Sequence, residues 1–116
     1  MLSLKALKPT KREKKRYIVY QIETDIKKSI QEKLLIKLKE NLGIFSSAKA
    51  GIIPIQFDNK TKIGIMRVNH KMVDEIRANF VLISKIDNEN IFVKTLGVSG
   101  ILKKAKEFTI KNCEEK

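Results

Sequence analysis

The sequence predicts an α+β fold in which an antiparallel four-stranded sheet carries two helices on one face and gains a further helix at the C-terminus. Three observations predict it. Runs of β-branched and aromatic residues alternate with segments whose apolar residues recur every three or four positions. Their order is strand, helix, strand, strand, helix, strand, helix. The last strand is apolar on both faces, so its second face also needs a cover, and the C-terminal helix is the available one.

The first strand is expected over residues 17–22, because Tyr-Ile-Val-Tyr-Gln-Ile is rich in strand-forming side chains. A helix is expected from about residue 26 to residue 42, with Asp25 as its N-cap. Apolar residues at helical spacing give this segment one buried side. Gly43 is expected to end the helix in a left-handed C-cap.

Residues 48–57 return to a strand pattern, and Pro54 places this strand at a sheet edge or at a bulge because proline donates no ladder hydrogen bond. A polar turn follows, and residues 62–68 are expected to pair back as a hairpin strand. Gly64 inside that strand indicates a bulge or a closely approaching neighbour.

A second helix is expected from His70 to about Ile83, capped by Asn69, and the last strand over residues 91–98. The stretch Leu96–Ala105 joins that strand to the third helix. Gly97 and Gly100 are expected to free the backbone at this turn, and Ser99 to cap the helix. The helix is amphipathic, with apolar residues on one side and lysines around the other.

This order is that of the ferredoxin-like βαββαβ sandwich, which is also the frame of the RNA-recognition motif. Such motifs stack bases on aromatic side chains of the sheet, but the third strand offers only Ile63, Ile65 and Met66. An RNA partner is therefore expected at the N-terminal arm, at helix ends and on basic faces, where contacts grip the phosphate backbone.

Composition favours a polyanionic partner, since 25 Lys and Arg against 13 Asp and Glu give a net charge of +12. Residues 1–16 form a basic arm with seven Lys or Arg and one Glu, for which a solvated tail is the alternative. Residues 17–112 are expected to be one domain, and residues 113–116 a charged tail. Without a membrane span, a signal-peptide core or a second cysteine, the chain is expected in the cytoplasm.

Catalysis by the chain itself is not expected. His70 is the single histidine, which excludes a histidine-cluster metal site. Gly97-Val98-Ser99-Gly100 is not a nucleophile elbow, because Ile101 stands where the second glycine belongs. No phosphate-binding loop or dinucleotide fingerprint occurs in the sequence.

Four stretches in this order carry a family resemblance. They are Lys14-Lys15-Arg16-Tyr17-Ile18 after the arm that contains Pro9, Ala50-Gly51-Ile52, Asp74-Glu75-Ile76-Arg77-Ala78, and Leu96-Gly97-Val98-Ser99-Gly100-Ile101-Leu102-Lys103-Lys104-Ala105. Together they resemble the archaeal ribonuclease P protein component 2 family, the counterpart of a small eukaryotic subunit of ribonucleases P and MRP. The resemblance covers nearly the whole chain, and the last stretch is its most specific part.

The resemblance implies a subunit without catalytic residues that supports a catalytic RNA in removing the 5′ leader of precursor tRNA. It implies magnesium on that RNA, no cofactor on the chain, and a larger barrel-type protein subunit as partner, in a heterotetramer with two copies of each. The residues expected to contact RNA are Lys11, Arg12, Lys14, Lys15, Arg16, Arg67, His70, Ser99, Gly100, Lys103 and Lys104.

Two other classes share this frame. Another basic RNA-binding scaffold, such as a ribosome-associated module, would bind RNA without assisting ribonuclease P RNA. A small-molecule regulatory domain usually has a glycine-bearing loop after the first strand, where this chain has Glu23-Thr24-Asp25. Tyr17, Ile44 and Phe45 are candidates for a protein interface, but the core is the expected place of each.

Overall fold

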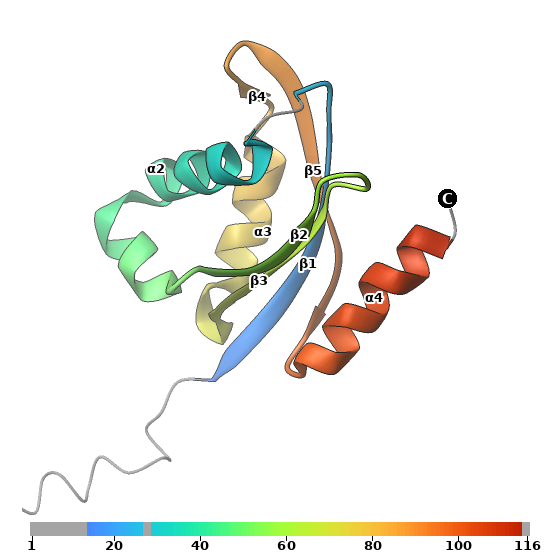
Figure 1. Ribbon diagram of the computed structural model, residues 1–116. Helices are drawn as coiled ribbons and strands as arrows, with labels where there is room; N and C mark the ends of the chain where they lie inside the picture. Colours follow the sequence, from blue (N-terminus) through green and yellow to red (C-terminus); the bar gives the residue numbers. More distant parts are fainter. Residues whose placement is uncertain (1–13, 27–28, 115–116) are drawn as a thin grey trace, which may run out of the picture.

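A five-stranded antiparallel sheet in the order β2-β3-β1-β5-β4 is the centre of the computed structural model, which describes residues 14–26 and 29–114 (Figure 1). The strands are β1 (Lys15–Thr24), β2 (Ile53–Asp58), β3 (Ile63–Asn69), β4 (Lys85–Ile86) and β5 (Glu89–Ser99). The helices are α2 (Ile30–Ala50), the 3₁₀ turn η2 (His70–Met72), α3 (Val73–Leu82) and α4 (Leu102–Glu114).

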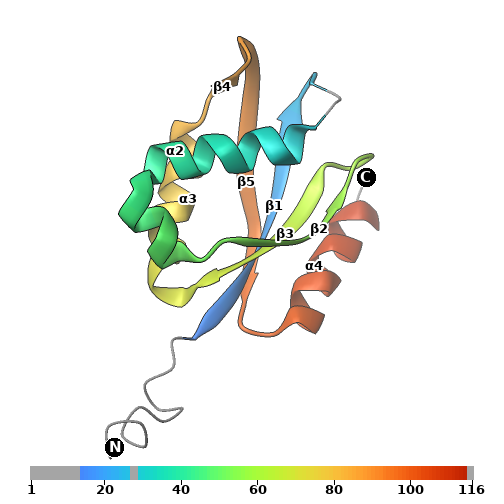
Figure 2. The same cartoon turned by 60° about the vertical axis from the view of Figure 1, so that its left-hand side comes forward.

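The two faces of the sheet have separate cores. Helices α2 and α3 cover one face, where Leu34, Leu38 and Phe80 pack among the buried side chains of the sheet. Helix α4 lies on the other face, where Ala105 packs in a second cluster with Val19 of β1 and with β3 residues (Figure 2). The predicted ferredoxin-like arrangement is thus confirmed, including the C-terminal helix as the cover of the second face.

The sheet has one strand more than the four expected. Lys85 pairs with Asn90 and Ile86 with Glu89, so β4 and β5 form a short hairpin. Its two-residue turn, Asp87-Asn88, has positive φ angles of 53° and 66°. Such a turn suits the right-handed twist of paired strands, and Asp and Asn tolerate the left-handed region. From the sequence this segment is expected only as a turn, because two-residue strands carry no periodic pattern.

Both predicted ends of the first helix are wrong. Asp25 is exposed in a bend, and the helix follows Ser29, which has a left-handed backbone with φ 53°. At the other end, Gly43 interrupts the helix with φ 84° and ψ 172°, but the helix resumes and ends at Gly51, with φ 54° and ψ 47°. Two glycines eight residues apart compete for the end, and both use backbone angles that other residues adopt at a cost.

The kink at Gly43 determines the solvent exposure of the two residues that follow it. Ile44 is 84% exposed and Phe45 is 83% exposed, so the expectation that they lie in the core is wrong. The buried stripe of the first part of α2 does not continue, because the kink turns the second part to a new direction. Tyr17 does pack against the second cluster, as expected.

Features of the middle hairpin confirm two predictions and correct one boundary. Strand β2 is an edge strand, and the register of its pairing with β3 shifts between Pro54 and Gln56, so Pro54 lies at both an edge and a bulge. A Cβ at Gly64 would lie 2.6 Å from Tyr20 Oη, which is the close neighbour expected there. The strand begins at Ile53 rather than at residue 48, because α2 extends to Ala50.

Gly97 and Gly100, which precede α4, are required for the space they leave to neighbouring side chains and not for unusual backbone angles. Among the described residues, positive φ values at glycine occur only at Gly43 and Gly51, so the expectation for Gly97 and Gly100 is wrong. A Cβ at Gly97 would lie 2.9 Å from the Phe108 ring, and one at Gly100 would lie 3.3 Å from Arg16 Nη1. Neither position leaves room for a side chain without movement of its neighbour.

Candidate nucleic-acid interface

Three segments that are distant in the sequence meet at one end of the sheet. Antiparallel pairing places Lys15 of β1 opposite Asn69 of β3, and Tyr17 of β1 opposite Ser99 of β5. The start of β1, the end of β3 and the end of β5 therefore share one end, from which α4 begins (Figure 1). We call this the basic end, defined by residues 14–16, 67–71 and 99–104.

Hydrogen bonds join the first two segments of the basic end. The His70 backbone N–H donates to the Lys14 carbonyl oxygen at 2.9 Å, and His70 Nδ1 lies 3.1 Å from the same oxygen. The Asn69 side chain accepts the Lys71 N–H at 3.1 Å, which confirms Asn69 as a cap. The predicted contact residues of β1 and η2 are thereby held in fixed relation to one another.

Arg16 connects β1 to the turn before α4. Its Nη1 donates to the Lys15 carbonyl oxygen at 3.0 Å and passes beside Gly100. Arg67 is half-buried on β3, and its Nε is enclosed without a hydrogen-bond acceptor among the described residues.

The polar groups of the turn before α4 form hydrogen bonds with one another. Ser99 Oγ accepts the Ile101 N–H at 3.1 Å and donates to the Ile101 carbonyl oxygen at 3.1 Å. The helix begins at Leu102, and the Ile101 carbonyl oxygen accepts the Ala105 N–H. Ile101 therefore occupies the N-cap position, and the expectation that Ser99 caps the helix is wrong. Ser99 instead closes the turn that precedes the helix. Lys103 and Lys104 follow in the first turn of α4, and both are exposed.

The residues that define the basic end include no Asp or Glu, and the first carboxylates after residue 71 are Asp74 and Glu75 in the first turn of α3. The ion pairs found between described residues are Lys33 with Asp87 and Lys94 with Glu23, and both lie outside the basic end. Carboxylates gather instead near the turns at the opposite end of the sheet: Glu23, Asp25, Asp58, Asp87 and Glu89. The Lys60 backbone N–H, donating to the Asp58 side chain at 2.8 Å, is the main cause that lowers the pKa of that carboxyl group.

Nine of the eleven predicted contact residues lie at the basic end: Lys14, Lys15, Arg16, Arg67, His70, Ser99, Gly100, Lys103 and Lys104. Lys11 and Arg12 fall outside the described residues. The sequence reasoning missed Lys71, which is exposed and follows His70 directly in η2. Its adjacency to His70, together with the cap at Asn69, was the signal available for finding it.

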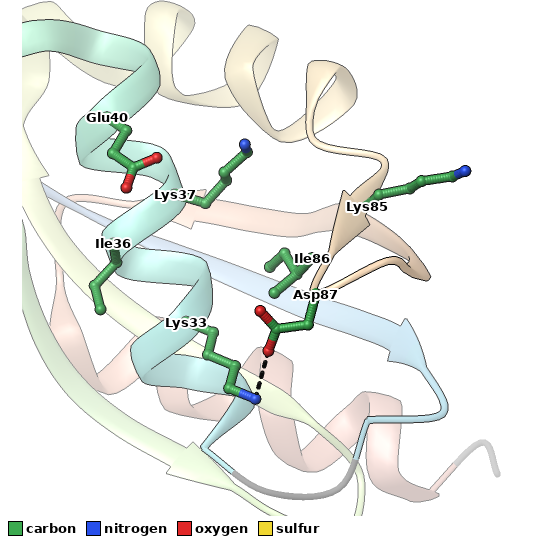
Figure 3. Close-up of a pocket in the computed structure, with 7 residues that line it drawn as sticks. All are labelled: Lys33, Ile36, Lys37, Glu40, Lys85, Ile86 and Asp87. Carbon is green, nitrogen blue, oxygen red and sulfur yellow. Dashed lines mark ion pairs between the residues drawn. The ribbon is translucent and has the colours of Figure 1, made fainter.

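A hollow of about 310 Å³ lies between α2 and the β4–β5 hairpin, away from the basic end (Figure 3). It is lined by Lys33, Ile36, Lys37, Glu40, Lys85, Ile86 and Asp87. Lys33 Nζ and Asp87 Oδ2 are 2.7 Å apart across it. Its lysines and carboxylates largely balance, so it does not extend the unopposed charge of the basic end.

Comparisons with known proteins agree on one family. The model of the Rpp14/Pop5 family matches residues 16–110. A protein of Thermococcus gammatolerans named ribonuclease P protein component 2 is 40% identical over 109 residues, which are 88% of each chain. Its namesake from Pyrococcus horikoshii is 36% identical over 109 residues and 91% of each chain. That of Methanocaldococcus jannaschii is 35% identical over 89% of this chain and 78% of its own.

A solved structure has the same fold. A chain in the cryo-electron microscopy structure of yeast ribonuclease MRP superposes with a TM-score of 0.62. The match covers 89% of this chain and 96% of that one, at 16% sequence identity. The arrangement of sheet and helices is therefore shared across a large distance in sequence.

Proposed function

Because this chain belongs to the Rpp14/Pop5 family, we propose that it is a protein subunit of ribonuclease P. In this role it supports a catalytic RNA in removing the 5′ leader of precursor tRNA. The proposal is supported by the family match over residues 16–110. It is also supported by relatives named ribonuclease P protein component 2, which are 33–40% identical over most of the chain.

The observation that carries the proposal is the convergence of unopposed cations at the basic end. A polyanion that meets this end gains several phosphate contacts at once and releases its condensed counterions. Arg67 adds a half-buried guanidinium to this end, and Lys103 and Lys104 extend the charge along α4. Contacts of this kind position an RNA by its backbone and do not read its bases.

The chemistry belongs to the RNA in this proposal. The single histidine, His70, directs Nδ1 at the Lys14 carbonyl oxygen, which leaves it engaged in holding two segments together. The described residues contain no group of three His, Cys, Asp or Glu side chains that could hold a metal ion. In this proposal magnesium is bound by the catalytic RNA, and the chain contributes neutralising charge that lets the RNA stay compact.

A protein partner belongs to the same proposal. The larger barrel-type subunit of ribonuclease P is the partner, with two copies of each chain in a heterotetramer. Exposed apolar side chains support a protein contact, among them Ile44 and Phe45 beyond the kink of α2. Within the described residues no helix is long and apolar enough to cross a membrane. The cytoplasm is the proposed compartment.

The two rival functions have less support. A regulatory domain would need a small-molecule site, and the hollow in Figure 3 is open and lined by five charged side chains. A different RNA scaffold would use the same basic end, but it would not account for the family match.

The test is cleavage of precursor tRNA by purified ribonuclease P RNA at low magnesium. The RNA is assayed alone, with this chain, with the barrel-type subunit, and with both proteins. Cleavage that appears only with both proteins is the expected result. A chain that binds the RNA while cleavage never improves would leave another RNA scaffold as the function.

A further inference from the structure

Arg16 lies at the centre of the basic end, and its surroundings differ from those of the lysines before it. Those two lysines are exposed, whereas Arg16 is half-buried. On one side Arg16 pairs with Val68 of β3. On the other side β1 and β5 pair as far as Tyr17 and Ser99, and the same register places Arg16 opposite Gly100. Arg16 thus stands between β3 and the turn that leads to α4.

The Arg16 side chain lies along Gly100. A Cβ at Gly100 would be 3.3 Å from Arg16 Nη1, 3.6 Å from Cζ and 3.9 Å from Cδ. Arg16 Nη1 also donates to the Lys15 carbonyl oxygen at 3.0 Å, which holds the far end of the side chain. An exposed arginine has many rotamers, and these two contacts favour one of them. The guanidinium is therefore oriented before any ligand arrives.

The Arg16 guanidinium keeps most of its capacity for hydrogen bonds. It carries several N–H donors in a fixed plane, and the bond to the Lys15 carbonyl oxygen uses only one of them. The ion pairs found between described residues do not include Arg16. Two parallel N–H donors match two oxygens of a phosphate, a geometry that arginine provides and lysine does not. Arg16 is thus suited to bind one phosphate through two hydrogen bonds.

The space that Arg16 occupies explains why residue 100 is a glycine. The φ angle of Gly100 is not positive, so no unusual backbone conformation requires glycine there. Gly100 is exposed, and the three nearest heavy atoms to a Cβ at this position all belong to Arg16. A side chain at residue 100 would therefore act first on the guanidinium.

We propose that Arg16 binds one phosphate of the RNA through paired N–H donors, and that Gly100 is a positioning residue that orients Arg16 without contacting the RNA itself. The inference rests on the proposed function for the identity of that RNA. An oriented guanidinium loses less conformational freedom on binding than an exposed lysine does, so it gives more affinity for the same charge. Arg16 thereby sets the register of the RNA backbone between the lysines of β1 and those of α4.

The first measurement separates the shape of Arg16 from its charge. Arg16→Lys keeps the charge but removes the planar pair of donors. It is expected to lower the affinity of the full chain for ribonuclease P RNA about fivefold, with little change in the slope of log affinity against log salt. Arg77→Lys is the matched control, because it makes the same exchange at an exposed arginine of α3 outside the basic end. The control is expected to bind as the parent does.

The second measurement is a double-mutant cycle between residues 16 and 100. Gly100→Val adds two further carbons to a Cβ that already touches Arg16. It is expected to lower RNA affinity about as much as Arg16→Ala, roughly tenfold, and to reduce the salt slope by about 1. In the Arg16→Ala background the valine is expected to cost nothing more, because the side chain that it displaces is gone.

Gly100→Ala supplies a milder step in the same cycle. Its methyl group requires Arg16 to shift by only a few tenths of an ångström, so its affinity is expected to lie between those of the parent and of Gly100→Val. All variants are checked for an unchanged denaturation midpoint, and affinities are compared at full folding. If the valine variant is too unstable to compare, the alanine variant completes the cycle.

The outcomes separate the inference from the proposed function. Equal losses from Gly100→Val with and without Arg16 would mean that residue 100 meets the RNA directly, which overturns the positioning role. If Arg16→Lys binds as well as Arg77→Lys while the protein still supports cleavage, the paired contact is overturned and the function stands. If the Arg16 variants lose affinity as expected while cleavage by the RNA never improves, the phosphate contact is supported and the proposed function is overturned.

Discussion

Gly97 of β5 lies directly beneath the ring of Phe108 of α4, so close that a Cβ at Gly97 would be 2.9 Å from Cε2 of the ring. The contact is on the face of the sheet that α4 covers, where Phe108 packs against the second apolar cluster. It lies next to the register shift between β1 and β5, where Val19 pairs with Gly97 and Tyr20 with Thr95. The absence of a side chain at Gly97 therefore sets how near α4 comes to the sheet.

Gly97→Ala is expected to destabilise the protein by about 1–3 kcal/mol, because an inserted methyl group must displace a packed ring. The measurement is chemical denaturation. Gly100→Ala is the matched control, since its new methyl group meets only the flexible end of Arg16 at 3.3 Å. That variant is expected to stay within about 0.5 kcal/mol of the parent. Equal losses in the two variants would contradict the role assigned to the Phe108 contact.

Alanine at Lys14, Lys15 and Arg16 together is expected to lower the affinity for ribonuclease P RNA. If each cation meets one phosphate, the slope of log affinity against log salt falls by about 2–3. Filter binding over a series of salt concentrations measures that slope. Alanine at Lys39, Lys60 and Lys85 removes the same charge from exposed sites away from the basic end. A slope that changes equally in both triple variants would remove the special role of the basic end.

Ser99→Ala is expected to act on stability more than on RNA binding. The hydroxyl donates to the Ile101 carbonyl oxygen and accepts the Ile101 N–H, so its only hydrogen is already used. Loss of a hydrogen bond of this kind costs about 1 kcal/mol. Denaturation should register this loss, while RNA affinity measured with the folded variant should fall less than threefold. A tenfold loss of affinity at full folding would show that Ser99 contacts RNA directly.

Strongly alkaline pH is expected to destabilise the fold through Tyr20. Burial raises the pKa of Tyr20 to about 12 from its ordinary value of 10.0. The unfolded chain therefore loses the phenolic proton first, and the stability contribution present below pH 10 is lost as the pH rises toward 12. A shift of this size corresponds to about 3 kcal/mol over that range.

Tyr20→Phe isolates this effect from the titration of the lysines. The stabilities of the parent and of the variant are compared between pH 9 and pH 12 in roughly half-unit steps by denaturation. The parent should lose more stability than the variant over this range. Parallel curves would mean that the Tyr20 hydroxyl ionises in the folded protein near its ordinary pKa.

The sequence by itself determined the layers of this protein. Apolar periodicity predicted which faces of α2, α3 and α4 are buried, because burial repeats with the geometry of a helix. An apolar last strand predicted that α4 would cover the second face, and Pro54 and Gly64 marked an edge and a close approach. The strand pairing in the structure then brings residues near Lys15, His70 and Ser99 together, since antiparallel neighbours share their ends.

Only the tertiary structure decided features that depend on competition between distant groups. Gly43 and Gly51 both carried a helix-ending signal, and the choice between them depends on how the chain after α2 reaches β2. The exposure of Ile44 and Phe45 follows from that choice. The narrow space at Gly97 depends on where Phe108 docks. Local sequence signals report what a segment favours, whereas these features are set by which segments pack together.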